Sequence, residues 1–329
     1  ITSIFGKRVA SVDTNRLDDS DLLNAVRRSE EMARLVPENP EYLPELGPQQ
    51  YQNNGAYYVE TGELEPSTRA SAAAIAIDQA NTAGQIVSSY MDVRAGTSSI
   101  GTSNGLFGSH SSTAVAYTLT SRSPDGLKSG WAGDAANNWN NIESQRVADD
   151  AIGKCRDWHK TPLDPGEYTV ILEPTAVGML MLRMMNSFNR RTADEGRSYF
   201  SNPNGGNRLG EQLFDERVNL WSDPAYADAE TAPFNSIGQP LARQKWVQDG
   251  RLTGLACSRY WAQQQGVEAL GSPSNFIMEG GDNPLEEMIA STSYGVLITR
   301  FWYIRGLNPR IISYTGLSRD GTFLIEDGK

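Results

Sequence analysis

The sequence contains few of the side chains that bind transition metals or act as nucleophiles. Among 329 residues there are two histidines, His110 and His159, and two cysteines, Cys155 and Cys257. Neither histidine belongs to a helix-spaced ligand pair, and the cysteines do not form a CxxC pair. A disulfide framework is therefore excluded, and a reducing compartment, the cytoplasm, is expected.

Two further absences exclude whole classes of function. No hydrophobic run approaches the ~18 residues that a membrane span requires. The net charge of −11 argues against a protein that binds phosphate backbones, because such proteins need clustered Lys and Arg. We therefore expect neither nucleic acid nor a membrane as a partner.

What is present indicates a globular chain of the α+β class. Hydrophobic residues make up 39% and charged residues 21%, which supplies ample core material. The length predicts two domains, and the turn sequence at 163–166 is the expected boundary. Residues 1–165 would form a sheet with helices, and 166–329 a mostly antiparallel β domain. Because the chain begins with Ile1 and stops at Lys329 directly after a turn, both domains are expected to be truncated.

Periodicity and turn residues predict the elements of the first domain. Strands are expected within 1–12, a helix over 21–35, a proline-rich connection over 37–48, a helix from Pro66 that Gly84 ends, strand-like runs over 85–121 and a helix over 142–157. Asn104-Gly105 predicts a hairpin turn. The Gly/Asn-rich stretch 123–141 reads as irregular, with Trp131 and Trp139 as anchors.

The second domain is expected to contain a strand over 166–174 and a helix over 175–189. Near its end, a short helix begins at Pro284, and Glu286 and Glu287 stabilise its first turn through the helix dipole. Three strand-like runs follow, VLITRFWYI, IISYTGL and GTFLIEDGK, the last two separated by the turn 318–321. This pattern predicts a helix that leads into an antiparallel meander.

The same stretch carries a resemblance. The ordered series GGDNPLEEMI, LITRFWYIR, TGLSRDGTF and LIEDGK resembles the C-terminal domain of the TldD/PmbA family. The segments EGRS, PFNSIG, DGRL and SRYWA match further pieces of that domain, with Asn235 where an aspartate is usual, and TNRLDD extends the match to the N-terminal half. Members are zinc-dependent peptidases and their metal-free partners, and the name "modulator of DNA gyrase" is shared with them.

In the peptidase branch, the helix that corresponds to 175–189 carries an HExxxH motif, which supplies two zinc ligands and a general base. Here Leu182 and Ser187 take the places of the two histidines, and Arg183 takes the place of the glutamate. Leucine cannot ligate zinc, and arginine cannot accept a proton at neutral pH. The resemblance therefore implies the metal-free, TldE/PmbA-like branch, with no catalytic residue and no bound cofactor.

Other candidate sites have simpler explanations. A zinc site from Cys155, His159 and an acid is one alternative, although a half-buried cysteine beside a surface histidine explains the spacing as well. Cys257 is expected to be a small buried hydrophobe rather than a nucleophile. The glycine-rich stretch 205–210 lacks the preceding strand and the lysine of a phosphate-binding loop.

The resemblance also implies a dimer with a cleft in which an extended peptide pairs with a β edge. Arg197 and Arg259 are the candidate peptide contacts, and purely structural arginines are the alternative. The leading hypothesis is a non-catalytic homologue that binds or gates peptide, as a homodimer or as a heterodimer with a TldD-like peptidase. An active metallopeptidase with unrecognised ligands is the first alternative, and an assembly subunit is the second.

Overall fold

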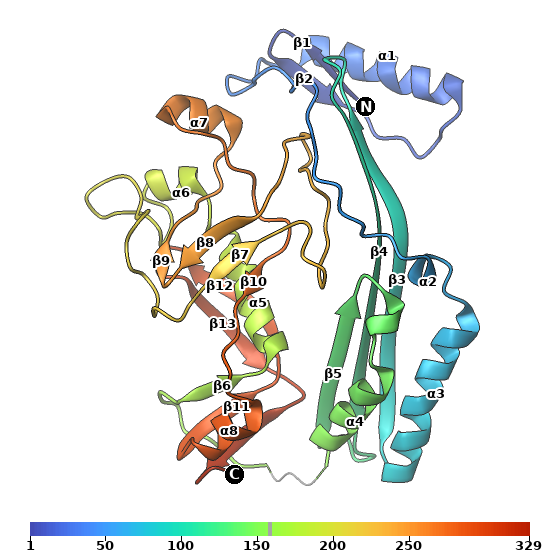
Figure 1. Ribbon diagram of the computed structural model, residues 1–329, viewed down its shortest axis with the longest axis vertical. Coiled ribbons are helices and arrows are strands. Elements are labelled where there is room, and N and C mark those ends of the chain that lie inside the picture. Colours follow the sequence, from blue (N-terminus) through green and yellow to red (C-terminus); the bar gives the residue numbers. More distant parts are fainter. Residues whose placement is uncertain (157–159) are drawn as a thin grey trace. The chain divides into compact units, whose positions relative to one another are not determined.

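A computed structural model describes residues 1–156 and 160–329 (Figure 1). Helices and mostly antiparallel sheets share the described chain, which confirms the predicted α+β class. The chain divides into two compact units, one of Ile1–Leu46 with Cys257–Leu270 and one of Gly47–Ala256 with Gly271–Lys329. The division predicted between residues 165 and 166 stays a prediction. No helix in the described ranges combines the length and the apolar composition of a membrane span.

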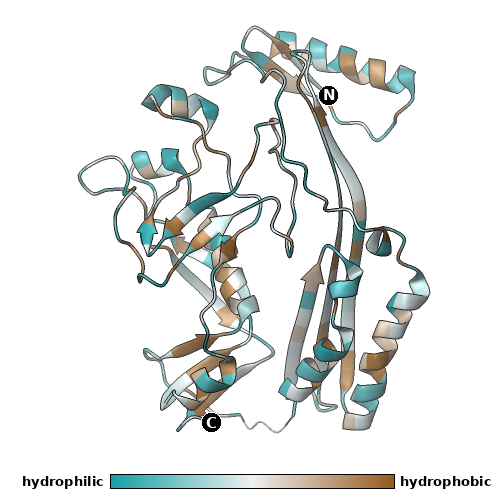
Figure 2. Ribbon diagram, in the orientation of Figure 1, coloured by the Kyte–Doolittle hydropathy of each residue, from teal (hydrophilic) through white to brown (hydrophobic). Residues whose placement is uncertain are grey.

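The first unit contains the predicted N-terminal hairpin and helix. Strands β1 (Thr2–Phe5) and β2 (Arg8–Ser11) pair antiparallel around Gly6, whose φ of +62° suits a residue without a Cβ. Helix α1 (Asp19–Leu35) shows alternating hydrophobic and hydrophilic bands in Figure 2 and buries a narrow stripe of small residues. The short helix α7 (Arg259–Gln265) belongs to the same unit.

A three-stranded antiparallel sheet organises the N-terminal part of the second unit. Its order is β3 (Ile86–Gly101), β4 (Phe107–Arg122) and β5 (Ser129–Ala136). The strand-like runs predicted over 85–121 are two continuous strands, and residues 102–106, with the predicted Asn104-Gly105 turn, connect them. The expectation of irregular structure throughout 123–141 was wrong, because β5 lies within that stretch.

Glycine explains this error. A Cβ on Gly130 would lie 2.2 Å from the carbonyl oxygen of Ala151 and 2.7 Å from the amide nitrogen of Cys155. The strand therefore needs glycine because helix α4 (Ser144–Lys154) approaches it closely. From composition alone, the glycines of this strand are indistinguishable from loop residues, which is why the stretch was predicted to be irregular.

Helices α3 (Pro66–Ala83) and α4 cover one face of this sheet (Figure 1). Pro66 starts α3 and Gly84, with a φ of +65°, ends it, as the sequence predicted. The one-turn helix α2 (Val59–Gly62) precedes α3. The core between the layers consists mainly of small and β-branched side chains, together with one tyrosine and one leucine: Ala76, Tyr117, Leu119, Ala132, Val147, Ala148 and Ala151.

The C-terminal segment forms two sheets rather than one meander. Strand β11 (Tyr294–Ile298) pairs antiparallel with β14 (Thr322–Glu326) and parallel with β6 (Val170–Leu172). Strands β12 (Phe301–Asn308) and β13 (Ser313–Ser318) pair separately. The predicted run VLITRFWYI is therefore two strands, and the prediction of one continuous strand was wrong. Helix α8 (Leu285–Ala290) precedes β11, as predicted.

A four-stranded sheet and an aromatic cluster complete the second unit. The sheet order is β10 (Ile277–Met278), β7 (Leu220–Ser222), β8 (Gln244–Gln248) and β9 (Arg251–Leu252). The ring of Phe188 contacts three other aromatic rings at centroid distances of 4.7 to 6.0 Å, those of Phe200, Trp246 and Phe276. Helices α5 (Pro174–Met185) and α6 (Arg190–Asp194) flank Phe188 in the sequence.

Candidate functional site

The candidate site lies where helix α5 ends. Pro174 occupies the first turn of α5, where its missing N–H costs no hydrogen bond, and the helix stops at Met185. Asn189 then caps α6, because its side chain accepts a hydrogen bond from the amide of Thr192 at 3.0 Å. The predicted helix over 175–189 is thus a shorter helix followed by a turn, and the turn aims polar groups into a pocket.

This pocket, which we call the α5 pocket, has a volume of about 410 Å³. Its walls come from the end of α5, from α6 and the turn after it, and from the connection between β12 and β13. The lining residues are Arg183, Asn186, Ser187, Thr192, Arg197, Ser198, Gly306, Asn308, Pro309, Ile312, Ser313 and Tyr314. Three residues singled out in the sequence, Arg183, Ser187 and Arg197, therefore meet in one pocket.

The fourth residue, Leu182, does not line the α5 pocket and is 59% exposed. The resemblance predicts that it replaces a histidine of the peptidase motif, and its side chain offers no ligand atom. Arg183, beside it, brings a permanent positive charge to the pocket wall.

The two arginines of the α5 pocket differ in their partners. The Nε of Arg197 donates to Glu195 Oε2 at 2.8 Å, and Arg191 donates to Glu195 Oε1 at 3.0 Å. Hydrogen bonds from Arg197 and then from Arg191 lower the pKa of the Glu195 carboxyl. In the described ranges the guanidinium of Arg183, which belongs to helix α5, forms neither a hydrogen bond nor an ion pair. Arg183 is therefore the guanidinium of this pocket that is free to meet a ligand.

The opposite wall is amphipathic. Tyr314 is half-buried, and burial raises the pKa of its phenol while the positive charge of Arg183 opposes that rise. Asn308 and Ser313 add polar side chains, and Ile312 adds an apolar one. A guanidinium, a phenol and amide groups around one cavity suit a carboxylate with an apolar portion.

Buried neighbours hold the pocket turn in place. Ser198 is buried, and its Oγ accepts a hydrogen bond from the amide of Phe200 at 3.2 Å. The amide of Tyr199 donates to the Pro309 carbonyl at 3.0 Å, which joins the turn to the β12–β13 connection. The pocket thus rests on fixed backbone rather than on free loops.

The residues of the α5 pocket do not fit zinc. Among the described residues, its ionisable lining groups are two arginines and one tyrosine, without a histidine, cysteine or carboxylate. Within residues 1–156 and 160–329, no cluster of three or more His, Cys, Asp or Glu could hold a metal ion. No catalytic step through a metal follows from these groups.

The other predicted metal candidates lie apart. Cys155 is buried, and desolvation raises the pKa of its thiol, whereas His159 lies outside the described residues, so their pairing stays an alternative. His110 on β4 is 8% exposed, and burial lowers its pKa. Cys257 is buried, as expected of a small hydrophobe.

Arg259 and Asn235 have local roles in the structure. Arg259 is the first residue of α7, whose N-cap Ser258 accepts from the amide of Trp261, and it belongs to the other compact unit. Asn235, which replaces the usual aspartate, accepts from the amides of Ile237 and Gln239 at 3.1 and 3.0 Å. The asparagine therefore performs the turn function that an aspartate would.

Sequence reasoning missed the β12–β13 side of the α5 pocket. Tyr314 and Ser313 lie in a run that reads only as a strand, and Ile312, with a φ of +48°, is strained in the connection. The dipeptide Asn308-Pro309 is the signal that could have marked this turn.

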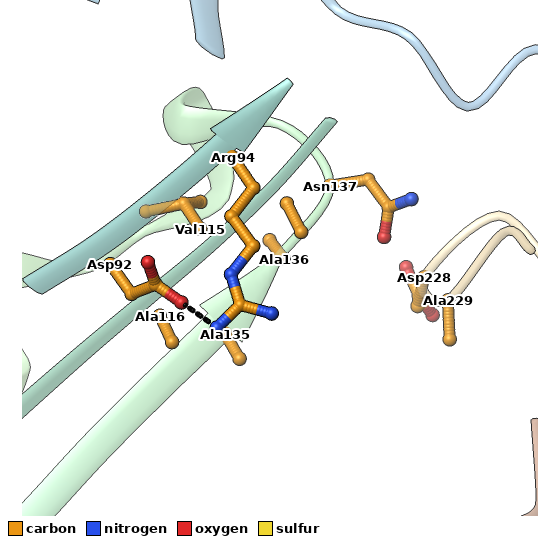
Figure 3. A pocket seen from close by; sticks show the side chains of 10 residues that line it. Asp92, Arg94, Val115, Ala116, Ala135, Ala136, Asn137, Asp228 and Ala229 are labelled. Carbon is orange, nitrogen blue, oxygen red and sulfur yellow. Dashed lines mark ion pairs between the residues drawn. The ribbon is translucent and has the colours of Figure 1, made fainter. Parts of the chain in front are cut away.

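A second pocket lies on the β3–β5 sheet (Figure 3). Its volume is about 380 Å³, its floor is built from alanines of β4 and β5, and Asp228 and Ala229 face it from a separate loop. Arg94 Nη2 lies 2.6 Å from Asp92 Oδ2, so these two charges neutralise each other. This pocket offers a polar rim without a free catalytic group, and the α5 pocket remains the candidate site.

Comparisons with known proteins agree with this architecture. The family described as the PmbA/TldA metallopeptidase C-terminal domain matches residues 165–329. TldE from Thermococcus kodakarensis superposes with a TM-score of 0.86 at 20% identity, over 100% of this chain and 78% of that one.

Two proteins described as modulators of DNA gyrase have the same fold. The one from Bacteroides thetaiotaomicron gives a TM-score of 0.83 at 23% identity, over 100% of this chain and 76% of its own. The one from Thermotoga maritima gives a TM-score of 0.83 at 18% identity, over 100% of this chain and 77% of its own. Among curated proteins, the search finds no match to the sequence.

Proposed function

Because the chain belongs to the TldD/PmbA family, we propose that it is a non-hydrolytic member that binds peptide in the α5 pocket and presents or gates it for a peptidase partner. The observation that carries this proposal is the pair of family-motif positions 183 and 187 in the wall of the α5 pocket. They hold a guanidinium and a hydroxyl where a peptidase would hold its general base and a zinc ligand.

The chemistry of the pocket favours a peptide carboxylate as the group that it recognises. Arg183 has no acidic partner in the described chain, and arginine binds carboxylates through paired N–H donors. Tyr314 and Ile312 on the facing wall suit an apolar side chain next to that carboxylate. A peptide C-terminus combines these two features.

The test compares peptides that differ only in this group. Fluorescently labelled hexapeptides with a free or an amidated C-terminus are titrated with the full chain, and binding is followed by fluorescence anisotropy. We expect the free acid to bind about tenfold more tightly, because one charge-assisted contact is lost in the amide. Arg183→Gln should remove this preference.

Arg217→Gln is the matched control, because Arg217 is an exposed arginine paired with Asp215 and is absent from the pocket lining. It should bind both peptides as the wild type does. Equal binding of acid and amide by the wild type would contradict the proposed recognition.

Two other outcomes point to the competing functions. Zinc near one equivalent per chain, measured in protein purified without chelator, together with peptide cleavage, would indicate an active metallopeptidase. Absence of peptide binding, with a stable assembly on size-exclusion chromatography coupled to light scattering, would indicate an assembly subunit.

A further inference from the structure

Three arginines surround one buried carboxylate at the turn between β13 and β14. The side chain of Asp320 is 3% exposed, and Arg300 Nη2 donates to its Oδ2 at 2.5 Å. Arg319 Nε lies 3.2 Å from the same oxygen, and Arg122 Nη2 lies 3.9 Å from Oδ1. The distance to Arg122 is an ion-pair distance that is too long for a hydrogen bond.

The three guanidiniums come from different parts of the fold. Arg122 is the last residue of β4, Arg300 lies between β11 and β12, and Arg319 follows β13. Asp320 sits between them with a φ of +55°, a conformation that few residues other than glycine adopt. The structure thus holds the carboxylate in a strained turn that gathers three cations.

The charges in this cluster do not balance. Three guanidiniums face one carboxylate, which leaves a net charge of about +2. Solvent screens part of this charge, because the side chains of Arg122 and Arg319 are 48% and 37% exposed, whereas that of Arg300 is 16% exposed. Glu173 is paired with Lys154 at 2.7 Å, and Asp125 accepts from Ser123 in its own turn, so neither carboxylate is paired with this cluster.

Two observations show that the positive charge is crowded. Arg300 Nε is buried without a hydrogen-bond partner in the described part of the chain. Burial lowers the pKa of the Arg300 guanidinium, the charge and hydrogen bond of Asp320 oppose that shift, and the charges of Arg319 and Arg122 lower the pKa by smaller amounts. An anion nearby would relieve this repulsion.

A pocket of about 210 Å³ opens beside the cluster. Leu127 and Ser129, from the β4–β5 connection and the start of β5, line one side, and Ser318, Arg319, Asp320 and Gly321 line the other. Arg122 is not a lining residue, and its guanidinium lies 3.9 Å from the Asp320 carboxylate. Arg122 is the cross-strand partner of Ser129, so its side chain leaves the same face of the sheet. The rings of Trp302 and Trp131 lie 4.3 and 4.7 Å from the guanidiniums of Arg319 and Arg300 and fix their planes.

We propose that this pocket binds the phosphoryl group of a small molecule through Arg319, with Ser129 and Ser318 as hydroxyl donors and with the neighbouring guanidinium of Arg122 adding its positive charge. A phosphoryl group carries about −1.5 to −2 charges and therefore matches the surplus better than a single carboxylate does. Arg300 and Asp320 hold the two outer guanidiniums in position. The overall charge of −11 makes such a site a local exception on this protein.

The test measures anion binding by the full chain at constant ionic strength. Isothermal titration calorimetry with inorganic phosphate, O-phosphoserine and acetate separates a free phosphate, a phosphate monoester and a carboxylate. We expect at least one phosphoryl compound to bind at least tenfold more tightly than acetate. Acetate binding as tight as that of both phosphoryl compounds, or no binding of either phosphoryl compound, would overturn the proposal.

Variants locate the site. Arg122→Gln and Arg319→Gln keep the Arg300–Asp320 pair, so both chains should fold, and each should weaken phosphoryl binding at least tenfold. Arg217→Gln, at an exposed arginine outside the cluster, should bind as the wild type does. Unchanged binding in both cluster variants would show that the three arginines only join the elements that carry them. Thermal melts without anion establish that each variant is folded.

Discussion

The second unit contains two cores that achieve close packing by opposite means. Under the β3–β5 sheet, Gly130 and Ala151 bring the backbones of strand and helix into contact, and no larger side chain fits between them. Beside the α5 pocket, the fully buried rings of Phe188 and Phe200 pack 4.7 Å apart with Trp246 next to them.

The two cores therefore tolerate different changes. In the core of small residues the backbones lie so close together that a substitution which enlarges a side chain lowers the stability. The aromatic core is stabilised by the large buried surfaces of its rings, so a substitution that truncates a ring lowers the stability. The aromatic core also adjoins the α5 pocket, because Ser187 directly precedes Phe188 and accepts a hydrogen bond at its carbonyl from Ser198 Oγ at 3.5 Å, and both serines line the pocket.

The largest effect is expected in the aromatic core. Phe200→Ala should lower the free energy of unfolding by about 3–5 kcal/mol, because it leaves a ring-sized cavity at a fully buried position. Denaturant titration followed by tryptophan fluorescence measures this loss. Phe107→Ala, at a 69% exposed phenylalanine on β4, should change stability by less than about 0.5 kcal/mol. Similar losses in the two variants would contradict the assigned core.

The next effect belongs to the core of small residues. Gly130→Ala should cost about 1–3 kcal/mol, since the new methyl group would lie 2.2 Å from the Ala151 carbonyl oxygen. Gly153→Ala, in helix α4 with open space around the new methyl group, should instead stabilise by about 0.5–1 kcal/mol. Thermal unfolding of the two variants should move in opposite directions, and a common direction would refute close approach at Gly130.

A smaller, pH-dependent effect on stability is expected from His110, a buried histidine on strand β4. Burial lowers its pKa below the ordinary value of about 6.5, and its Nε2 is buried without a partner in the described ranges. As the pH falls from about 6.5 toward the folded-state pKa, the unfolded chain gains a proton that the folded chain refuses. Stability is therefore fully present above pH 6.5 and is lost below it, by at most about 1.4 kcal/mol per pH unit.

His110→Gln should remove this part of the pH dependence. The measurement is the difference in unfolding free energy between wild type and variant from pH 7.5 to pH 5. A difference that does not change with pH would show that His110 is protonated equally in both states.

The smallest effect is expected outside both cores. Arg217→Gln removes an exposed ion pair with Asp215, and exposed pairs of this kind contribute little to stability. Its melting temperature should match that of the wild type within error, although hydrogen bonds from Arg217 lower the pKa of the Asp215 carboxyl. A clear shift would mean that surface charge contributes to stability beside these cores.

Local signals in the sequence predicted those elements that local signals define. Pro66 and Gly84 delimit α3, and Asn104-Gly105, with a φ of +84° at Gly105, lies in the connection between β3 and β4. Strand β5 was missed because its glycines look like loop residues until helix α4 is known to approach them. The family resemblance singled out Arg183, Ser187 and Arg197, but the pocket that they share was not predicted, because its β12–β13 side comes from a segment more than 100 residues further along the chain.

By itself, the sequence determined the α+β class and the family resemblance, and it predicts that Leu182, Arg183 and Ser187 replace the HExxxH side chains. Each of these depends on residue identity and short-range order alone. Only the tertiary structure decided that Arg183 and Arg197 face Tyr314 across one pocket, and that Arg122, Arg300 and Arg319 surround Asp320. Such sites depend on which strands pair and how closely the layers pack, and both are set by the burial of the whole chain rather than by any single segment.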